Sequence, residues 1–180
     1  MNPSSAPLWR VALLIISLAL GASGCGPRDP LDRVVSAESP TAFSMWRSSA
    51  AGYLNASQLQ DFDEATRELK MAVMNNRETT GTAAVEEAMR EKINGKTVRE
   101  AMRLAYESKI KRLEVDLKGL AIATEQNSRL TTRPGDTDSS KYLAGFNERQ
   151  KTRVDATERD LHAAQEKLKA LGPPADAAKR

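Results

Sequence analysis

The sequence is poor in the side chains from which packed sheets are built. Aromatic residues make up only 4% of the 180-residue chain, and much of its 40% hydrophobic fraction is alanine. β-Sheets depend on valine, isoleucine, phenylalanine and tyrosine for their packing. The composition therefore argues against an all-β or α/β fold and favours an all-α protein.

An excess of charge of one sign is also missing. The 27 lysine and arginine residues nearly balance the 24 aspartate and glutamate residues, which gives a formal net charge of +3. Proteins that bind nucleic acid concentrate positive charge on one face, whereas acids and bases are interspersed in this chain. We therefore expect no nucleic-acid partner.

Cysteine and histidine are represented by one residue each, Cys25 and His162. A single cysteine excludes an intramolecular disulfide. One cysteine and one histidine also cannot supply the ligands of a zinc site, and nothing in the spacing suggests a partner set for a histidine-based catalytic triad. The sequence thus predicts no metal site, no cofactor and no enzymatic activity.

The N-terminus has an apolar run, residues 11–20, that is too short to cross a membrane. As a helix it would span about 15 Å, roughly half of the hydrocarbon thickness of a bilayer. Arg10 precedes the run, and small residues follow it at positions 21–24. This order is typical of a secretory signal peptide, which we predict for residues 1–24.

Ala22-Ser23-Gly24-Cys25 resembles the lipobox of bacterial lipoprotein precursors. The resemblance implies cleavage before Cys25, which then carries a diacylglyceryl thioether and an amine acylated with a fatty acid such as palmitate. It departs from the common pattern at Ala22, where leucine is most frequent. By the same resemblance, Gly26 in place of aspartate fits sorting to the outer membrane with the domain facing the periplasm. The alternatives for Cys25 are an ordinary thiol and a leader that is cleaved slightly later.

The next segment, residues 25–39, has two prolines and few apolar side chains. We expect it to be a flexible tether behind the lipidated cysteine. Short helices are expected over residues 40–95. The first has Ser39 as its N-cap, and a second extends from about Ser57 to Asn75 behind a capping box of Ser57 and Gln60. A third buries three apolar side chains at helical spacing, namely Val85, Met89 and Ile93.

Residues 96–171 carry two long helical patterns of similar length. Thr97 and Glu100 form a capping box before the first pattern, and Asp138, Ser139 or Ser140 can cap the second. Two long helices joined by a short connection favour an antiparallel hairpin, and the alternation of four and three residues between apolar positions favours a coiled coil. The fold expected is thus a long helical hairpin with two or three shorter helices at its base, followed by a disordered tail over residues 172–180.

Two groups of apolar side chains are candidates for contacts. Leu104, Val115 and Ile122 lie off the main seam of the first long helix. We expect the short helices to cover Leu104, whereas Val115 and Ile122 leave open a contact with a partner protein or a second copy. The second group consists of the aromatic side chains Phe43, Trp46 and Tyr53, which suit the core of the short helices or a contact with a ligand or membrane surface.

The acidic side chains near the start of the second short helix suit an ordinary solvated face better than an acid–base pair. They are Asp61, Asp63, Glu64 and Glu68. The function expected is that of a lipid-anchored, periplasm-facing envelope protein that acts as a spacer, scaffold or docking element without catalysis. The alternative is a periplasmic module that binds a small ligand with the aromatic segment Phe43 to Tyr53.

Overall fold

The chain was analysed as a computed structural model, which describes residues 29–75, 81–133 and 135–173. Its elements are a 3-10 turn and five α-helices, in the order η1 (Pro30–Asp32), α2 (Pro40–Ala50), α3 (Ala56–Asn75), α4 (Thr82–Ile93), α5 (Val98–Ser128) and α6 (Thr137–Ala170). Within these ranges there is no β-strand, and one isolated antiparallel bridge joins Val34 to Thr97. The prediction of an all-α fold is confirmed. Among the described residues, no helix combines the length and the apolar character needed to cross a membrane.

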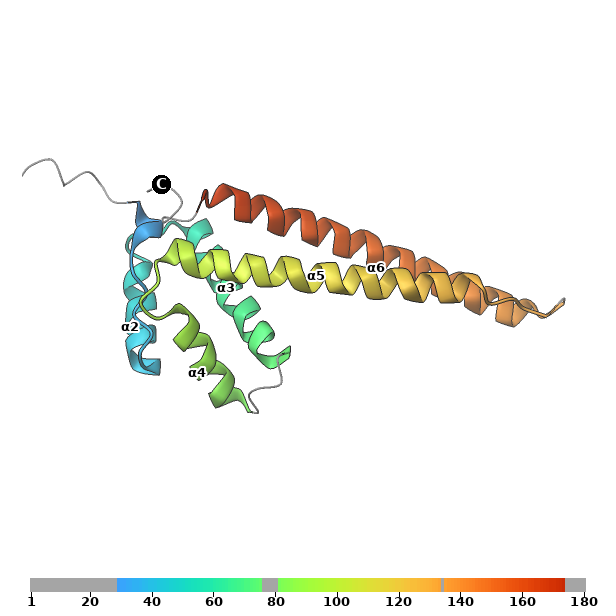
Figure 1. Cartoon of the computed structure of the whole chain (residues 1–180), viewed down its shortest axis with the longest axis horizontal. Coiled ribbons are helices and arrows are strands. Elements are labelled where there is room, and N and C mark those ends of the chain that lie inside the picture. The colour runs from blue at the N-terminus through green and yellow to red at the C-terminus, as the bar shows by residue number, and fades with distance from the viewer. Residues whose placement is uncertain (1–28, 76–80, 134, 174–180) are drawn as a thin grey trace, which may run out of the picture.

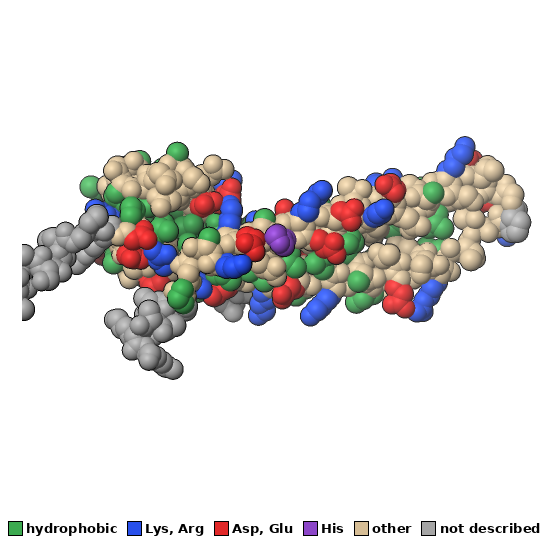
Figure 2. Space-filling view, turned by 90° about the horizontal axis from the view of Figure 1, so that it is seen from above, with side chains coloured by type: hydrophobic (Ala, Val, Ile, Leu, Met, Phe, Trp, Pro, Cys, Tyr) green, Lys and Arg blue, Asp and Glu red, His purple; other side chains and the backbone are tan. Residues whose placement is uncertain are grey.

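The helices divide between a body and a projection (Figure 1). The body consists of α2, α3, α4 and the first half of α5, with α3 packed across α5 and against α4. Helices α5 and α6 lie side by side and extend well beyond the body. We call residues 117–158, in which α5 and α6 project past α3, the arm. Lysine, arginine and acidic side chains are interspersed along it (Figure 2).

Two of the expected helix starts are confirmed. The hydroxyl of Ser39 accepts a hydrogen bond from the backbone N–H of Ala42 at 3.1 Å, with Pro40 at the first helical position. At the start of α5, Thr97 and Glu100 form the reciprocal capping box. Each cap provides an acceptor for a backbone donor that lacks a partner within the helix.

Two other caps differ from the prediction. Helix α3 begins with a box made by Asn55 and Gln58, whose side chains each accept a hydrogen bond from the other's backbone N–H, instead of the box expected at Ser57. Asn55 has the capping chemistry of serine and lies two residues earlier, which starts the helix at Ala56. Helix α6 is capped by Asp136, whose carboxylate accepts the backbone N–H of Ser139 at 3.0 Å.

The core of the body lies where α3, α4 and α5 meet. Val85, Met89 and Ile93 of α4 are all buried, as their spacing predicted. Phe62 of α3 is fully buried beside them. Leu104 of α5 packs against this core, which confirms that the short helices cover it.

The expectation of a flexible tether over residues 25–39 is wrong for residues 29–39, because Val35 and Ala37 are only 1% and 2% exposed. The backbone N–H of Val35 donates to the carbonyl of Lys96 at 2.8 Å, and the N–H of Gly95 donates back to the carbonyl of Val35 at 3.0 Å. The segment thus lies along the loop between α4 and α5. Two small apolar side chains on alternate positions are enough to hold this segment in place, because the loop also forms hydrogen bonds with the backbone groups of the segment.

Candidate functional site

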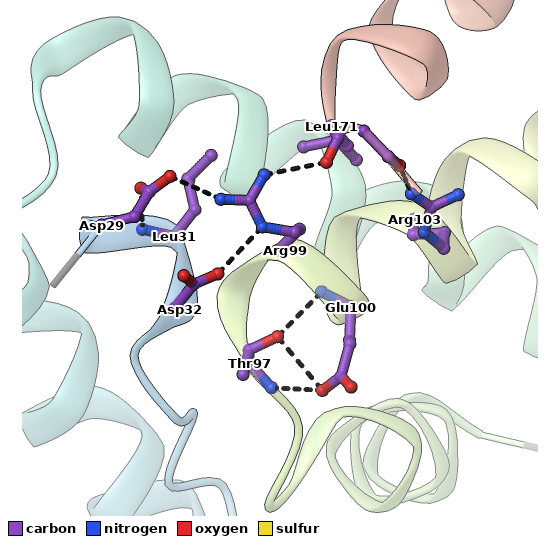
Figure 3. Close-up of polar contacts among 9 residues, drawn as sticks. Asp29, Leu31, Asp32, Thr97, Arg99, Glu100, Arg103 and Leu171 are labelled. Atoms are coloured by element: carbon purple, nitrogen blue, oxygen red, sulfur yellow. Dashed lines mark hydrogen bonds and ion pairs between the residues drawn. The ribbon is translucent and has the colours of Figure 1, made fainter. Parts of the chain in front are cut away.

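Arg99, near the start of α5, donates hydrogen bonds to three residues that are far from it in the sequence (Figure 3). Its Nε donates to Asp32 Oδ1 at 2.9 Å, its Nη2 donates to Asp29 Oδ2, and its Nη1 donates to the carbonyl oxygen of Leu171 at 2.8 Å. One guanidinium therefore joins the first described residues of the chain, the start of α5 and the end of α6. The hydrogen bond with Asp32 is the main cause that raises the pKa of Arg99.

One turn further along α5, Arg103 donates to the carbonyl oxygen of Gly172. The last carbonyls of a helix have no partner within it, so both arginines supply donors that the C-terminus of α6 lacks. Gly172 has a φ of +72°, the left-handed conformation that ends many helices. We call this set the Arg99 clasp, and its members are Asp29, Asp32, Arg99, Arg103, Leu171 and Gly172.

A second link joins α6 to α3. Lys167 Nζ donates to Asp61 Oδ1 at 2.8 Å and to Glu64 Oε2 at 3.0 Å. Burial favours a lower pKa for Lys167, but the hydrogen bonds with the two carboxylates outweigh it and the pKa is raised above its usual value. The hydrogen bond with Lys167 in turn lowers the pKa of Glu64.

The ammonium group of Lys167 also lies 5.8 Å from the ring centre of Tyr106 on α5. Burial is the main cause that raises the pKa of this phenol to about 12, with a further contribution from the charge of Asp61. The hydroxyl of Tyr106 is buried, and no hydrogen-bond partner for it occurs among the residues that the structure describes. Its ring contributes packing to the core, whereas the hydroxyl contributes no bond.

A third link joins α3 to α5 through a buried carboxylate. Arg112 donates through Nε and Nη2 to the two oxygens of Glu68, each at 2.9 Å. The paired geometry matches the fork of the guanidinium to the carboxylate. The hydrogen bond with Glu68 raises the pKa of Arg112.

The expectation that the acidic residues of α3 form an ordinary solvated face is therefore wrong. Glu68 is buried, and each of the four carboxylates is bonded to a cation on another helix. Asp63, for example, accepts a hydrogen bond from Arg47 of α2 at 2.8 Å. These four carboxylates thus join α3 to α2, α5 and α6. Among the described residues, no group of three or more histidine, cysteine or acidic side chains is placed to hold a metal ion.

The aromatic candidates Phe43, Trp46 and Tyr53 pack against the core of the body. Phe43 and Trp46 are stacked with ring centres 6.1 Å apart, and Trp46 lies 5.1 Å from the ring of Phe62. The indole N–H of Trp46 donates to the carbonyl of Val34 at 2.9 Å. These contacts favour the core interpretation of the cluster over a ligand contact.

The other candidates, Val115 and Ile122, are 60% and 57% exposed on α5. Between them on the same helix lies Gly119, and no other part of the described chain comes within 4 Å of a Cβ placed there. Val115 and Ile122 both remain largely exposed, whereas Leu104 packs against the core of the body. Val115 lies at the root of the arm, where it lines a groove together with Ala72 and Asn75 of α3.

The Arg99 clasp was missed because its members are far apart in the sequence. One local signal is present, since Arg99 lies within the predicted capping box of Thr97 and Glu100 and Arg103 follows one turn later on the same face of the helix. Asp29 and Asp32 lie in the segment predicted to be a flexible tether, and a flexible segment offers no fixed partner for Arg99. Cys25 and the lipobox lie outside the described residues.

No protein-family model, no curated protein and no solved structure matches this chain.

Proposed function

We propose that the chain is a lipid-anchored protein of the bacterial cell envelope, facing the periplasm, that acts as a spacer and docking element without catalysis. Cys25 carries the lipid, and α5 and α6 form an antiparallel hairpin that holds a docking surface away from the membrane. One observation carries the proposal. Arg99 binds both the segment that follows the lipobox and the last turn of α6, so the anchored end of the chain is fixed to the base of the hairpin.

The hairpin is supported by the side chains that α5 and α6 bury. Leu113 and Leu120 of α5 are buried seven residues apart, and Gln150 and Ala164 of α6 are buried fourteen residues apart. Multiples of seven are the repeat of a coiled-coil seam. The hydrogen bonds from Arg99 and Arg103 to the end of α6 further support an antiparallel pair, because such a pair brings the start of one helix to the end of the other.

A docking role is supported by the exposed face of α5. Val115 and Ile122 are also seven residues apart, and both are largely exposed, with Val115 at the edge of a groove that α3 helps to line. Gly119 costs an exposed helix about 1 kcal/mol relative to alanine, and the open space beside it leaves room for a neighbouring backbone. The proposed occupant is a helix, supplied by a partner protein or by a second copy of this chain.

The anchoring is tested by fractionation of cells that express the full chain or its Cys25→Ser variant. The proposal expects the unaltered protein in the membrane fraction and the variant in the soluble fraction. Arg99→Ala serves as a control, because it alters the folded domain while leaving the lipidation site intact. A Cys25→Ser variant that stays bound to membranes would refute the anchor.

The docking face is tested separately with a photo-crosslinking amino acid in place of Gln126, on the same exposed side of α5. A product of twice the mass of the chain identifies a second copy, and a product of another defined mass identifies a partner protein. Either product is expected to disappear when Val115 and Ile122 are both changed to glutamate. If crosslinking is unaffected by these changes, this face is not the docking surface.

A further inference from the structure

The described chain begins at the end of the body that is opposite to the tip of the arm (Figure 1). Arg99 holds Asp29 there. Only residues 26–28 separate Asp29 from Cys25, so the two Cα atoms lie within about 14 Å of each other even when that segment is fully extended. If Cys25 is lipidated, as the proposed function holds, this end of the body lies next to the membrane.

Two exposed large apolar side chains lie on the elements at this end. Val34 is 58% exposed and Met45 is 70% exposed. Val34 follows η1 directly, and its carbonyl accepts the hydrogen bond from Trp46 of α2. The segment that leads from the anchor is thereby bonded to the helix that carries Met45.

The aromatic side chains of this end are only half buried. The indole N–H of Trp46 donates to the carbonyl of Val34. The guanidinium of Arg33 lies over the ring of Tyr53, 4.3 Å from the ring centre. Tryptophan, tyrosine and arginine combine an apolar part with a polar group, which suits them to the boundary between lipid and water.

The charges at this end nearly balance. Asp29 and Asp32 both pair with Arg99. The exposed carboxylate of Glu38 is offset by Arg33, which belongs to the same segment and forms no ion pair within the described chain. The three acidic and two basic side chains leave a net charge of −1, so the apolar side chains approach anionic lipid headgroups against only weak repulsion.

We propose that this surface, made of Arg33, Val34, Met45, Trp46 and Tyr53, contacts the lipid surface that holds the anchor. The contact orients the domain, and α5 then points away from the membrane. A helix of 31 residues is about 46 Å long, so the tip of the arm is held at roughly that distance from the lipid. This inference rests on the proposed function, because the acyl chains of Cys25 bring the surface to the membrane.

Trp46 provides the test, because Trp9 lies in the predicted leader and Trp46 is then the only tryptophan of the mature chain. The lipidated protein is reconstituted into vesicles of phosphatidylethanolamine and phosphatidylglycerol with brominated acyl chains, which quench tryptophan close to lipid. We expect Trp46 to be quenched, and we expect the double variant Val34→Glu and Met45→Glu to lose about half of that quenching. The matched control changes Val115 and Ile122 to glutamate and should be quenched as strongly as the unaltered protein.

A second measurement does not depend on Trp46. A polarity-sensitive fluorophore is attached to the single free thiol of Met45→Cys or of Leu130→Cys, which replace similarly exposed apolar residues at the two ends of the molecule. The emission of the label at position 45 should shift to the blue in vesicles, whereas that at position 130 should not. Lipidated protein in which Trp46 is unquenched, or in which the two labels respond alike, would overturn the orientation while leaving the anchor in place. A chain that carries no lipid and stays in solution would instead refute the proposed function itself.

Discussion

The guanidinium of Arg99 donates to the carboxylate of Asp32 at 2.9 Å across 67 residues of sequence. The same side chain also donates to the carbonyl of Leu171 at 2.8 Å. A single residue near the start of α5 therefore joins the first described residues of the chain to the end of α6.

Replacing Arg99 with alanine should destabilise the domain and loosen its first described residues. The change leaves the carbonyl of Leu171 without its donor and Asp29 and Asp32 without their cation. We expect a loss of about 1–3 kcal/mol in the free energy of unfolding, measured by urea denaturation. Arg159→Ala removes an exposed arginine for which the structure shows no ion pair, and it should change the stability by less than about 0.5 kcal/mol. Equal losses in the two variants would show that the clasp contributes nothing specific.

The buried pair between Glu68 and Arg112 predicts a larger single-site effect. Glu68→Gln removes one charge from a contact in which the carboxylate is buried and bound by two hydrogen bonds. We expect a loss of about 2–4 kcal/mol, since the partly buried guanidinium loses its close carboxylate partner and keeps only Asp116, at 3.5 Å. The double variant with methionine at both positions should recover most of that loss. A double variant less stable than Glu68→Gln would contradict this interpretation of the pair.

Stability should fall at alkaline pH because of Lys167 and Tyr106. The folded state raises the pKa of Lys167 above its usual 10.5 and that of Tyr106 from its usual 10.0 to about 12. A raised pKa means that the folded chain holds the proton more tightly than the unfolded chain does. The resulting stabilisation is complete below pH 10 and is lost as the pH rises above it.

The variant Tyr106→Phe separates the contribution of Tyr106 to the loss of stability at alkaline pH from that of Lys167. Since the hydroxyl has no hydrogen-bond partner in the described structure, the variant should be at least as stable as the unaltered chain at pH 7. Between pH 10 and pH 12 its urea midpoint should decline less steeply, because only Lys167 still titrates in the cluster. A large loss of stability at pH 7 would show that the hydroxyl forms a bond after all.

Two neighbouring positions on α5 test which face packs against α6. Leu113 is 5% exposed and Val115 is 60% exposed. Leu113→Ala should cost about 2–4 kcal/mol, whereas Val115→Ala should cost less than about 0.5 kcal/mol. Thermal unfolding followed by circular dichroism provides the comparison. If Val115→Ala cost more stability than Leu113→Ala, the face of α5 that carries Val115 would be the packed one, which would contradict this account.

The features predictable from the sequence are those fixed by neighbouring residues. The spacing of Val85, Met89 and Ile93 identified the buried face of α4, and the Thr97 and Glu100 box identified the start of α5. Both signals lie within one or two helical turns. The cap of α3 was misplaced by two residues because asparagine and serine offer the same capping chemistry.

The features that escaped prediction join residues far apart in the chain. Lys167 bonds to Asp61 over 106 residues, and nothing in the local pattern of either helix distinguishes those side chains from solvated ones. Val35 and Ala37 were likewise assigned to a tether because few apolar residues surround them. Their segment is held by backbone hydrogen bonds to the loop before α5, about 60 residues further along the chain, which no local pattern indicates.

The most direct test of the whole account is mass spectrometry of the N-terminal peptide of the protein purified from the membranes of the cells that produce it. The account predicts that Cys25 is the first residue and that it carries a diacylglyceryl group on its sulfur and a fatty acid on its amine. An unmodified Cys25, or a chain that begins after it, would contradict the anchor and the membrane orientation that depends on it.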